Sequence, residues 1–277
     1  MKVRYLGTGA AEGIPALFCN CPFCTGARER GEIRSRAQIV LDGELSIDFP
    51  PDAFYHAARF GTDFSALKYL LITHSHMDHF YAHDFPLRGY KYAYDLTSPV
   101  LHIYGNAEVL EVFQECTARE MKAEVAPAIA LHKIAPFETH RFGGYTVHTL
   151  AAQHSSREPL LFLIEKGNKR VLHLADTGAI PEESERFLAS LGAAACDLVT
   201  LDCTLLFNKT EKASRHMGLD ENMRTLEKLA RIGLINGSTK KVITHFSHNS
   251  APCEELLAKA EDEFGVIAAY DGMTIEI

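Results

Sequence analysis

Hydrophobic and polar positions along this chain show the patterns of strands in some segments and of helices in others. The order of these segments predicts strands first and helices later. In the first quarter the apolar runs are short and strand-like, and Asp42-Gly43 between two of them predicts a tight hairpin. Farther along, segments with helical spacing alternate with strand-like runs. The expected strands are 2–7, 37–41, 45–48, 67–73, 145–150, 160–165, 169–176, 197–202, 240–248 and 273–277, and the expected helices are 107–125, 181–192, 219–233 and 251–265.

An α/β fold with sheets inside and helices outside follows from this order, because both faces of a sheet must be covered. The chain has 277 residues, of which 47% are hydrophobic. That is enough for a large core, and it excludes disorder or a fibre. We find no repeat, no low-complexity tract and no linker rich in Pro, Gly or Ser, so we expect residues 1–277 to form one domain.

Charge and cysteine usage narrow the class of protein. The net charge is −8 and no basic stretch stands out, so a broad nucleic-acid-binding face is not indicated. The N-terminus has no secretory signal, and no apolar run approaches the roughly 18 residues that span a bilayer. The seven cysteines are an odd number, which argues against a disulfide framework. We therefore expect a cytoplasmic protein without membrane contact.

The most informative motif is THSHMDH, which begins at the end of the apolar run 67–73. Positions i and i+2 at a strand end point the same way, so His74 and His76 can converge on one ion. Asp78 and His79 follow and can face a neighbouring ion. Imidazole and carboxylate suit Zn²⁺, Mn²⁺ and Fe²⁺ alike. Because so dense a pattern rarely arises by chance, it predicts a metal site rather than a surface loop.

Four donors are too few for two metal sites, so further ligands must come from other strand ends. His154, Asp176 and His245 each stand just past an apolar run. A buried sheet presents residues in such positions at a common edge. A lone histidine at a strand end is more often an ordinary polar residue, but the neighbouring motif makes these three the best candidates.

Over nearly the whole chain, the segments THSHMDH, AAQHS, LADTG and THFSH resemble the metallo-β-lactamase superfamily. The resemblance implies a four-layer αββα sandwich with a dinuclear metal site at one edge of the two sheets. It also implies a ligand set for each ion and one shared ligand. The first ion would take His74, His76 and His154, the second Asp78, His79 and His245, and both would share Asp176. His83 departs from the family pattern, and we do not expect it to be a ligand.

A second cluster, Cys19-x-Cys21-x-x-Cys24, is one ligand short of a tetrahedral structural zinc site. His248, three residues past His245, is the candidate for the fourth ligand. A Cys₃His site has no open position, so a structural Zn²⁺ there would act in folding and rigidity. It would tie the N-terminal loop to the loop that carries an active-site ligand. The alternative is three free thiols in a loop.

The cysteine loop together with the downstream His-x-x-His resembles one branch of the superfamily, the cyclic phosphodiesterase that accompanies the carbon–phosphorus lyase of phosphonate breakdown. A protein of pyrroloquinoline quinone biosynthesis has a similar loop and is a rival match. His216 stands just ahead of the helix expected at 219–233. The phosphodiesterase branch implies that His216 is a general acid or a phosphate clamp, whereas the plainer interpretation is a helix-flanking residue. We predict His216 and Asp78 as catalytic residues.

We therefore expect a metal-dependent phosphodiesterase that uses a hydroxide bridging two divalent ions, either Mn²⁺ or Zn²⁺ or else Fe²⁺. Two such ions about 3.5–4 Å apart lower the pKa of a shared water toward ~7 and neutralise phosphate charge. The expected substrate is a small cyclic phosphodiester such as a ribosyl 1,2-cyclic phosphate. Activity is expected to fall at low pH, because the metals need neutral histidines. Dimers are common in such enzymes, so a homodimer is compatible with the resemblance, but the sequence does not determine the oligomeric state.

Two other functions stay open. A nuclease of the tRNA 3′-processing type shares the ligand set, but the net charge of −8 and the lack of an obvious basic insertion argue against it. A non-hydrolytic metal-binding partner in pyrroloquinoline quinone biosynthesis should have an incomplete site, yet all seven ligand candidates are present. A diiron oxidoreductase fits less well, because that branch typically has Glu where this chain has His76.

Overall fold

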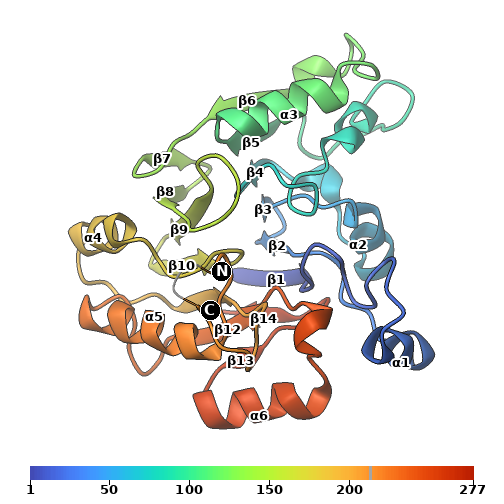
Figure 1. Cartoon of the computed structure of the whole chain (residues 1–277). Coiled ribbons are helices and arrows are strands. Elements are labelled where there is room, and N and C mark those ends of the chain that lie inside the picture. The colour runs from blue at the N-terminus through green and yellow to red at the C-terminus, as the bar shows by residue number, and fades with distance from the viewer. Residues whose placement is uncertain (212–213) are drawn as a thin grey trace.

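Two seven-stranded sheets form the centre of the molecule (Figure 1). The computed structural model describes residues 1–211 and 214–277. The first sheet has the order β14 (Thr274–Glu276), β1 (Lys2–Gly7), β2 (Gln38–Leu41), β3 (Leu45–Ile47), β4 (Tyr69–Leu71), β5 (Leu101–Gly105) and β6 (Ile129–Lys133). The second has the order β13 (Ile267–Ala268), β12 (Lys240–Thr244), β11 (Leu198–Asp202), β10 (Lys169–Leu174), β9 (Leu160–Lys166), β8 (Tyr145–Ala151) and β7 (Thr139–Phe142).

Helices cover the outer faces of both sheets (Figure 1). The first sheet packs against α2 (Ala53–Phe60) and α3 (Ala107–Thr117). The second sheet packs against α4 (Glu182–Ser190), α5 (Leu219–Arg231) and α6 (Glu254–Phe264), and α1 (Pro22–Arg30) adds Ala27 to the same cluster. The result is the four-layer αββα sandwich expected for this α/β chain.

The inner faces of the sheets share one apolar core. Val3, Ile39 and Leu41 from the first sheet pack in one cluster with Phe162 and other residues of the second. These side chains alternate with outward-facing ones along each strand, as a sheet covered on its inner face requires. Burial of this apolar area is the main term that holds the layers together.

Parallel strands in both sheets end at a common edge of the sandwich. In the first sheet β3, β4, β5 and β6 run parallel, and in the second β10, β11, β12 and β13 do. The carboxyl ends of parallel strands are where open α/β sheets usually bind ligands. The loops after β4, β10 and β12 carry six of the seven predicted ligands of the dinuclear site, and the seventh, His154, follows β8.

The structure agrees with most of the expected elements and differs at the short and exposed ones. The hairpin at Asp42-Gly43 is present: β2 and β3 pair antiparallel, and both turn residues have positive φ. The helix expected at 107–125 is α3, and it ends at Thr117, because residues 118–120 are exposed and do not pack against the core. The sequence analysis missed α1, α2, β5, β6, β7 and β13. Among these, β6 and β7 are half-exposed edge strands with little hydrophobic periodicity.

Among the residues described here, no helix combines the length and apolar character needed to cross a membrane.

Candidate metal centre

The loop after β4 is fastened at its start by a buried carboxylate. Asp48 Oδ1 accepts hydrogen bonds from the backbone N–H of Thr73 at 2.8 Å and from its hydroxyl at 2.9 Å. Both residues are buried, so these bonds fix where the loop leaves the strand. The motif residues that follow are buried at His74, Asp78 and His79 and half-buried at His76.

The seven ligand candidates meet in two groups. Within each group every ligating atom lies within 4.8 Å of the others. The first group is His74, His76, His154 and Asp176, and the second is Asp78, His79, Asp176 and His245. The shared carboxylate has its Oδ2 atom 3.2, 3.1 and 3.3 Å from the Nε2 atoms of His74, His79 and His154. One oxygen thus faces both groups, and the cluster is suited to a dinuclear metal site.

In three of these imidazoles the nitrogen Nδ1 contacts a side chain outside the two groups. The Nδ1 atoms of His74, His79 and His245 lie 2.9, 2.7 and 2.8 Å from Thr73 Oγ1, Asp48 Oδ2 and Thr204 Oγ1. Such contacts fix the orientation of a ring and leave Nε2 for an ion. The sequence analysis did not single out the three outer residues as partners: Thr73 opens the motif THSHMDH, whereas Asp48 and Thr204 belong to no recognisable motif.

The chemistry of the cluster centre fits divalent cations. His79 Nε2, Asp176 Oδ1 and His245 Nε2 are buried and have no hydrogen-bond partner among the described residues. Buried polar atoms are nearly always paired, because an unpaired one loses its hydration without compensation. Two imidazole nitrogens and a carboxylate oxygen that converge in this way are typical ligands of Zn²⁺, Mn²⁺ or Fe²⁺.

Two of the ligand candidates have unusual backbone conformations. Asp176 and His245 have φ angles of 54° and 64°, in the left-handed region that residues other than glycine rarely adopt. Each follows one of the parallel strands of the second sheet, β10 or β12. Strained residues of this kind persist where the surroundings over-determine them, and they are concentrated at functional sites.

A further carboxylate, which the sequence analysis missed, lies beside His216. Asp202 is the last residue of β11 and is fully buried. Its Oδ2 atom lies 3.3 Å from His216 Nδ1 and 3.4 Å from His245 Nδ1. Asp176 Oδ1 lies 3.1 Å from the same His216 nitrogen. The available signal was an aspartate directly after an apolar strand, the same position in which Asp176 was recognised.

These carboxylates set the charge of His216. Burial lowers the pKa of its imidazole, but the adjacent carboxylates of Asp176 and Asp202 outweigh burial and raise the pKa to about 10. The ring is therefore protonated at neutral pH, which is the form that a general acid requires.

Burial and nearby carboxylates also have opposite effects on the pKa values of the histidine ligand candidates. Burial prevails at His154, whose pKa falls to about 4, and it also lowers the pKa of His74. At His79, Asp78 and Asp48 outweigh burial and raise the pKa well above its usual value. At neutral pH the first two imidazoles are neutral and able to bind a cation, whereas His79 holds a proton that a cation must displace.

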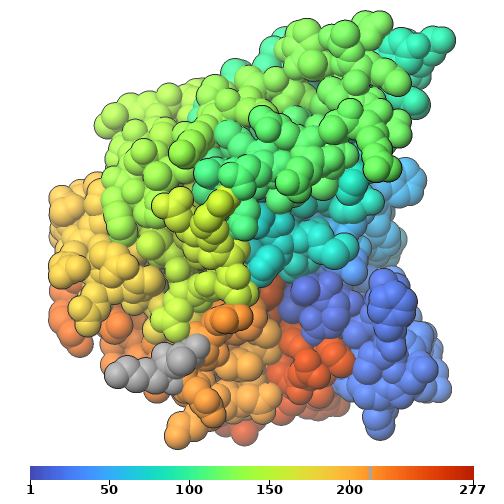
Figure 2. All heavy atoms as spheres, turned by 45° about the horizontal axis from the view of Figure 1, so that its top comes forward, coloured from blue at the N-terminus to red at the C-terminus, as the bar shows by residue number. Residues whose placement is uncertain are grey.

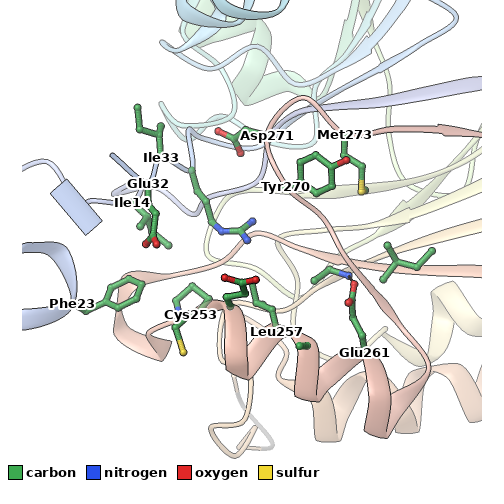
Figure 3. Close-up of a pocket in the computed structure, with 16 residues that line it drawn as sticks. Ile14, Phe23, Glu32, Ile33, Cys253, Leu257, Glu261, Tyr270, Asp271 and Met273 are labelled. Carbon is green, nitrogen blue, oxygen red and sulfur yellow. Dashed lines mark hydrogen bonds between the residues drawn. The ribbon is translucent and has the colours of Figure 1, made fainter. Parts of the chain in front are cut away.

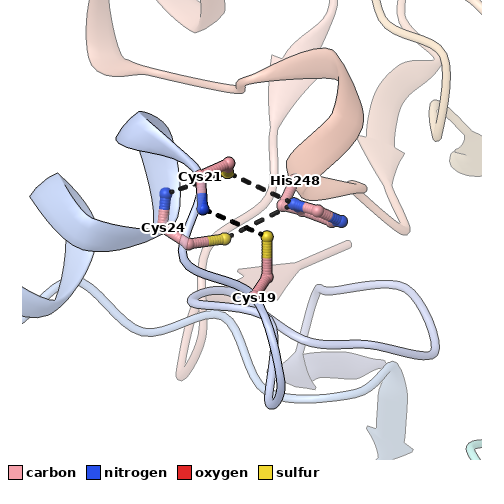
Figure 4. A group of neighbouring side chains, drawn as sticks. All are labelled: Cys19, Cys21, Cys24 and His248. Atoms are coloured by element: carbon pink, nitrogen blue, oxygen red, sulfur yellow. Dashed lines mark hydrogen bonds between the residues drawn. The ribbon is translucent and has the colours of Figure 1, made fainter.

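The cysteine cluster forms where the N-terminal loop meets the loop after β12 (Figure 4). Cys19, Cys21, Cys24 and His248 place their Sγ and nitrogen atoms within 4.8 Å of one another. His248 Nδ1 lies 3.4 Å from Cys24 Sγ and 3.8 Å from Cys21 Sγ. The four residues are the predicted Cys₃His set, and thiolate with imidazole suits a tetrahedral structural Zn²⁺.

The local structure around the cysteines differs from the loop that was expected. α1 begins at Pro22 with Cys21 as its N-cap, so Cys24 lies in the first helical turn. The backbone N–H of Cys24 and then His248 lower the pKa of the Cys21 thiol to about 6. Burial raises the pKa of the Cys24 thiol to about 11. One thiol is therefore ready to bind a metal at neutral pH, and the other must lose its proton on binding.

A cavity of about 410 Å³ opens over the two ligand groups and has His76, Asp78 and His216 on its wall. A larger cavity of about 550 Å³ lies elsewhere, against α6, with Leu257, Glu261 and Tyr270 on its wall (Figure 3). The larger cavity contains none of the ligand candidates. Seven other histidines belong to neither group within the described chain: His56, His83, His102, His132, His140, His148 and His173.

The chain matches one protein family over most of its length. Residues 46–246 match the family model for the beta-lactamase superfamily domain. The chain belongs to the metallo-β-lactamase superfamily. In this superfamily member, the two ligand groups coincide with the sets that the resemblance of the motifs implied.

Solved structures show the same fold. A diphosphatase of the PhnP family has a TM-score of 0.74 and 22% identity, with 100% of this chain and 98% of that chain covered. Zn²⁺-bound PqqB from Methylobacterium extorquens has a TM-score of 0.73 and 20% identity, with 100% of both chains covered. The short form of human tRNase Z has a TM-score of 0.69 and 19% identity, with 100% of this chain and 99% of that chain covered.

Two curated proteins are similar in sequence. An octanoyltransferase from Porphyromonas gingivalis is 24% identical over 99% of this chain and 51% of its own length. This superfamily member thus spans about half the length of that relative. Coenzyme PQQ synthesis protein B from an Azoarcus species is 55% identical over 38 residues, which are 14% of this chain and 12% of that protein.

Proposed function

We propose that this protein is a metal-dependent phosphodiesterase that acts on a small cyclic phosphodiester, such as a ribosyl 1,2-cyclic phosphate. The superfamily and the His/Asp cluster together indicate a metal-dependent hydrolase. The single observation that favours a phosphodiester is the position of His216 beside the two ligand groups, with Nδ1 3.1 Å from Asp176 and 3.3 Å from Asp202. These carboxylates favour the protonated ring, because they raise its pKa. A diester has a poor alkoxide leaving group, and a positioned acid is what its departure requires.

Each group of residues has a separate part in the proposed reaction. Two divalent ions, when bound by the seven ligands, supply a water of lowered pKa and neutralise the charge of the phosphate. His216 has Nδ1 held by Asp176 and Asp202, and its Nε2 has no hydrogen-bond partner among the described residues. The Nε2 proton is therefore available to the leaving oxygen, and the two carboxylates keep the ring charged and in one orientation.

The size of the cavity supports a small substrate over tRNA. A volume of about 410 Å³ is that of an ordinary small-molecule site. The net charge of −8 also disfavours a long polyanion, whose binding depends on neutralising many phosphates. We keep tRNA cleavage as the second candidate because the ligand set is shared. A gel shift with tRNA at several salt concentrations separates the two: no shift at 50 mM salt is the expected result.

Hydrolysis of bis-p-nitrophenyl phosphate by the Mn²⁺-loaded protein tests the proposal. We expect turnover by the wild type and a loss of at least about 10³-fold in Asp176→Asn, because that carboxylate faces both ion sites. Asp84→Asn is the matched control: Asp84 is a half-buried aspartate outside both groups, and its loss should leave the rate within about twofold. Turnover of a β-lactam or a thioester, with no diester hydrolysis by fully metallated protein, would overturn the proposal.

A further inference from the structure

The wall of the cavity above the metal groups is polar but carries little positive charge. Apart from the metal-group residues and His216, its polar residues are Glu12, Ser155, Asn208, Ser247, Asn249 and Ser250, together with Thr204. No lysine or arginine is among the described residues that line it. A pocket built for a second phosphate would carry such cations. Hydroxyl, amide and carboxylate groups instead match a neutral partner that is rich in hydroxyls.

Glu12 is the one carboxylate on this wall that belongs to neither metal group. Its Oε1 atom accepts hydrogen bonds from Ser247 Oγ at 2.6 Å and from the His248 backbone N–H at 3.3 Å. Its Oε2 atom has no hydrogen-bond partner among the described residues, and 31% of the side chain is exposed. One oxygen thus holds the carboxylate in place, and the other is free to accept a hydrogen bond from a ligand.

The neighbours of Glu12 fix its position from both sides. Its backbone carbonyl accepts from the Leu17 N–H at 3.2 Å, and the preceding carbonyl of Ala11 accepts from Arg36 Nε at 2.8 Å. His248 belongs to the Cys₃His cluster through Nδ1, and its Nε2 lies 3.9 Å from Glu12 Oε1. N-terminal residues and residues of the last third of the chain lie together on one face of the molecule (Figure 2). A carboxylate held this firmly loses little entropy when it binds a ligand.

We propose that Glu12 is a specificity-determining residue: with Asn208 and Asn249 it forms a subsite for the hydroxyl groups of a sugar-like phosphodiester. This inference rests on the proposed function, and it specifies which substrates the proposed active site prefers. The free Oε2 atom accepts a hydrogen bond from a substrate hydroxyl, and the asparagine amides take further hydroxyls. The same negative charge repels every anionic ester, most of all one with an additional phosphate, and only a substrate hydroxyl bonded to Oε2 offsets that repulsion.

Glu12→Gln, which keeps the shape and removes the charge, tests the subsite with three Mn²⁺-supported substrates. For ribose 1,2-cyclic phosphate we expect KM to rise about tenfold, because a charge-assisted hydrogen bond becomes a neutral one. For bis-p-nitrophenyl phosphate, which has no hydroxyl, we expect KM to fall, because a repelling charge is gone and no hydrogen bond is lost. For the 5-phosphorylated ribose ester we expect a smaller rise in KM, because the lost repulsion of its second phosphate offsets part of the lost hydrogen bond. Glu29→Gln is the matched control, since Glu29 is exposed on α1 and does not line the cavity.

A rise in KM for the ribose ester together with a fall in KM for the aryl diester distinguishes substrate selection by Glu12 from a structural role. A merely structural Glu12 raises KM for all three substrates and lowers Tm, and that result overturns the inference. The inference is also overturned if Glu12→Gln leaves the ratio of the KM values for the ribose ester and the aryl diester unchanged. If the wild type hydrolyses no diester, the proposed function fails. Titration of the metal-loaded protein with ribose 1-phosphate then decides the subsite on its own: weaker binding by Glu12→Gln supports it, and equal binding refutes it.

Discussion

At the scale of single residues, this site is defined by what the second nitrogen of each imidazole contacts. His74, His79 and His245 turn Nδ1 toward Thr73, Asp48 and Thr204 and leave Nε2 at the cluster centre. His216 points Nδ1 at two carboxylates, Asp176 and Asp202. Burial thus favours the neutral ring at His74 and His154, whereas carboxylates favour the charged ring at His216.

Asp202 should control the pH at which the enzyme loses activity on the alkaline side. The pKa of His216 is raised to about 10, so the charged form is lost as pH rises through that value. His216→Asn should lower kcat by about 10²–10⁴-fold. Asp202→Asn removes one of the two carboxylates that raise the pKa, and it should move the alkaline limb of the kcat–pH profile to lower pH. An unmoved alkaline limb in Asp202→Asn contradicts the assignment of His216 as the acid.

On the acid side, the His154 imidazole should stay neutral below the usual histidine range. The pKa of His154 is lowered to about 4, chiefly by burial, so this ring stays neutral until pH falls toward that value. A depressed pKa makes the neutral ring favourable above the unfolded value of about 6.5, and the advantage is lost as pH falls through the folded pKa. An NMR titration of the histidines in the metal-free protein should place the midpoint of His154 well below pH 6.5. A midpoint near pH 6.5 would contradict the dominance of burial at this ring.

At the scale of elements, the metal-ligand candidates lie at strand ends and on the short helix α1. The ligands after β4, β10 and β12 were predictable because each follows an apolar run directly. α1 was not predictable in the same way, because it is nine residues long and buries only Cys24 and Ala27. Its stability therefore depends on tertiary contacts and on the cysteine cluster, since a helix this short is marginal by itself.

Cys24→Ser should remove the ion of the Cys₃His cluster without emptying the other two sites. Cys24 is fully buried next to His248, so its loss breaks the tetrahedral set. We expect one metal ion fewer per chain and a Tm lower by about 5–10 °C, as about 2–3 kcal/mol is lost in a protein of this size. Cys253→Ser is the control, because that half-buried cysteine lies outside the cluster. An equal metal count in both variants would contradict the zinc assignment.

At the scale of the whole molecule, the sandwich places loops from two sheets at one edge. The first sheet supplies the motif after β4, and the second supplies His154, Asp176 and His245. No single element contains a complete site. Metal binding should therefore stabilise the whole fold and not one segment, because the ligands of each ion come from both sheets.

Purified protein should contain three metal ions per chain, of which mild chelation removes two. The Cys₃His set is closed and should hold its ion, whereas the cavity gives access to the other two. Reloading the two sites with Mn²⁺ at pH 7 should restore activity and release protons, because the pKa of His79 is raised well above its usual value. A pH indicator in weak buffer measures the release. Reloading without proton release would show that His79 is already neutral.

The sequence by itself determined which residues can form the centre and where the chain places them. Strands recognised from apolar runs end at His74, Asp176 and His245, and a dense motif needs no tertiary information to suggest metal. Only the tertiary structure showed that the donor atoms lie together in two groups, that Asp202 reaches His216, and that Glu12 lies in the cavity. These are distances between segments far apart in the chain, and hydrophobic periodicity records which face of an element is buried but not which element it meets.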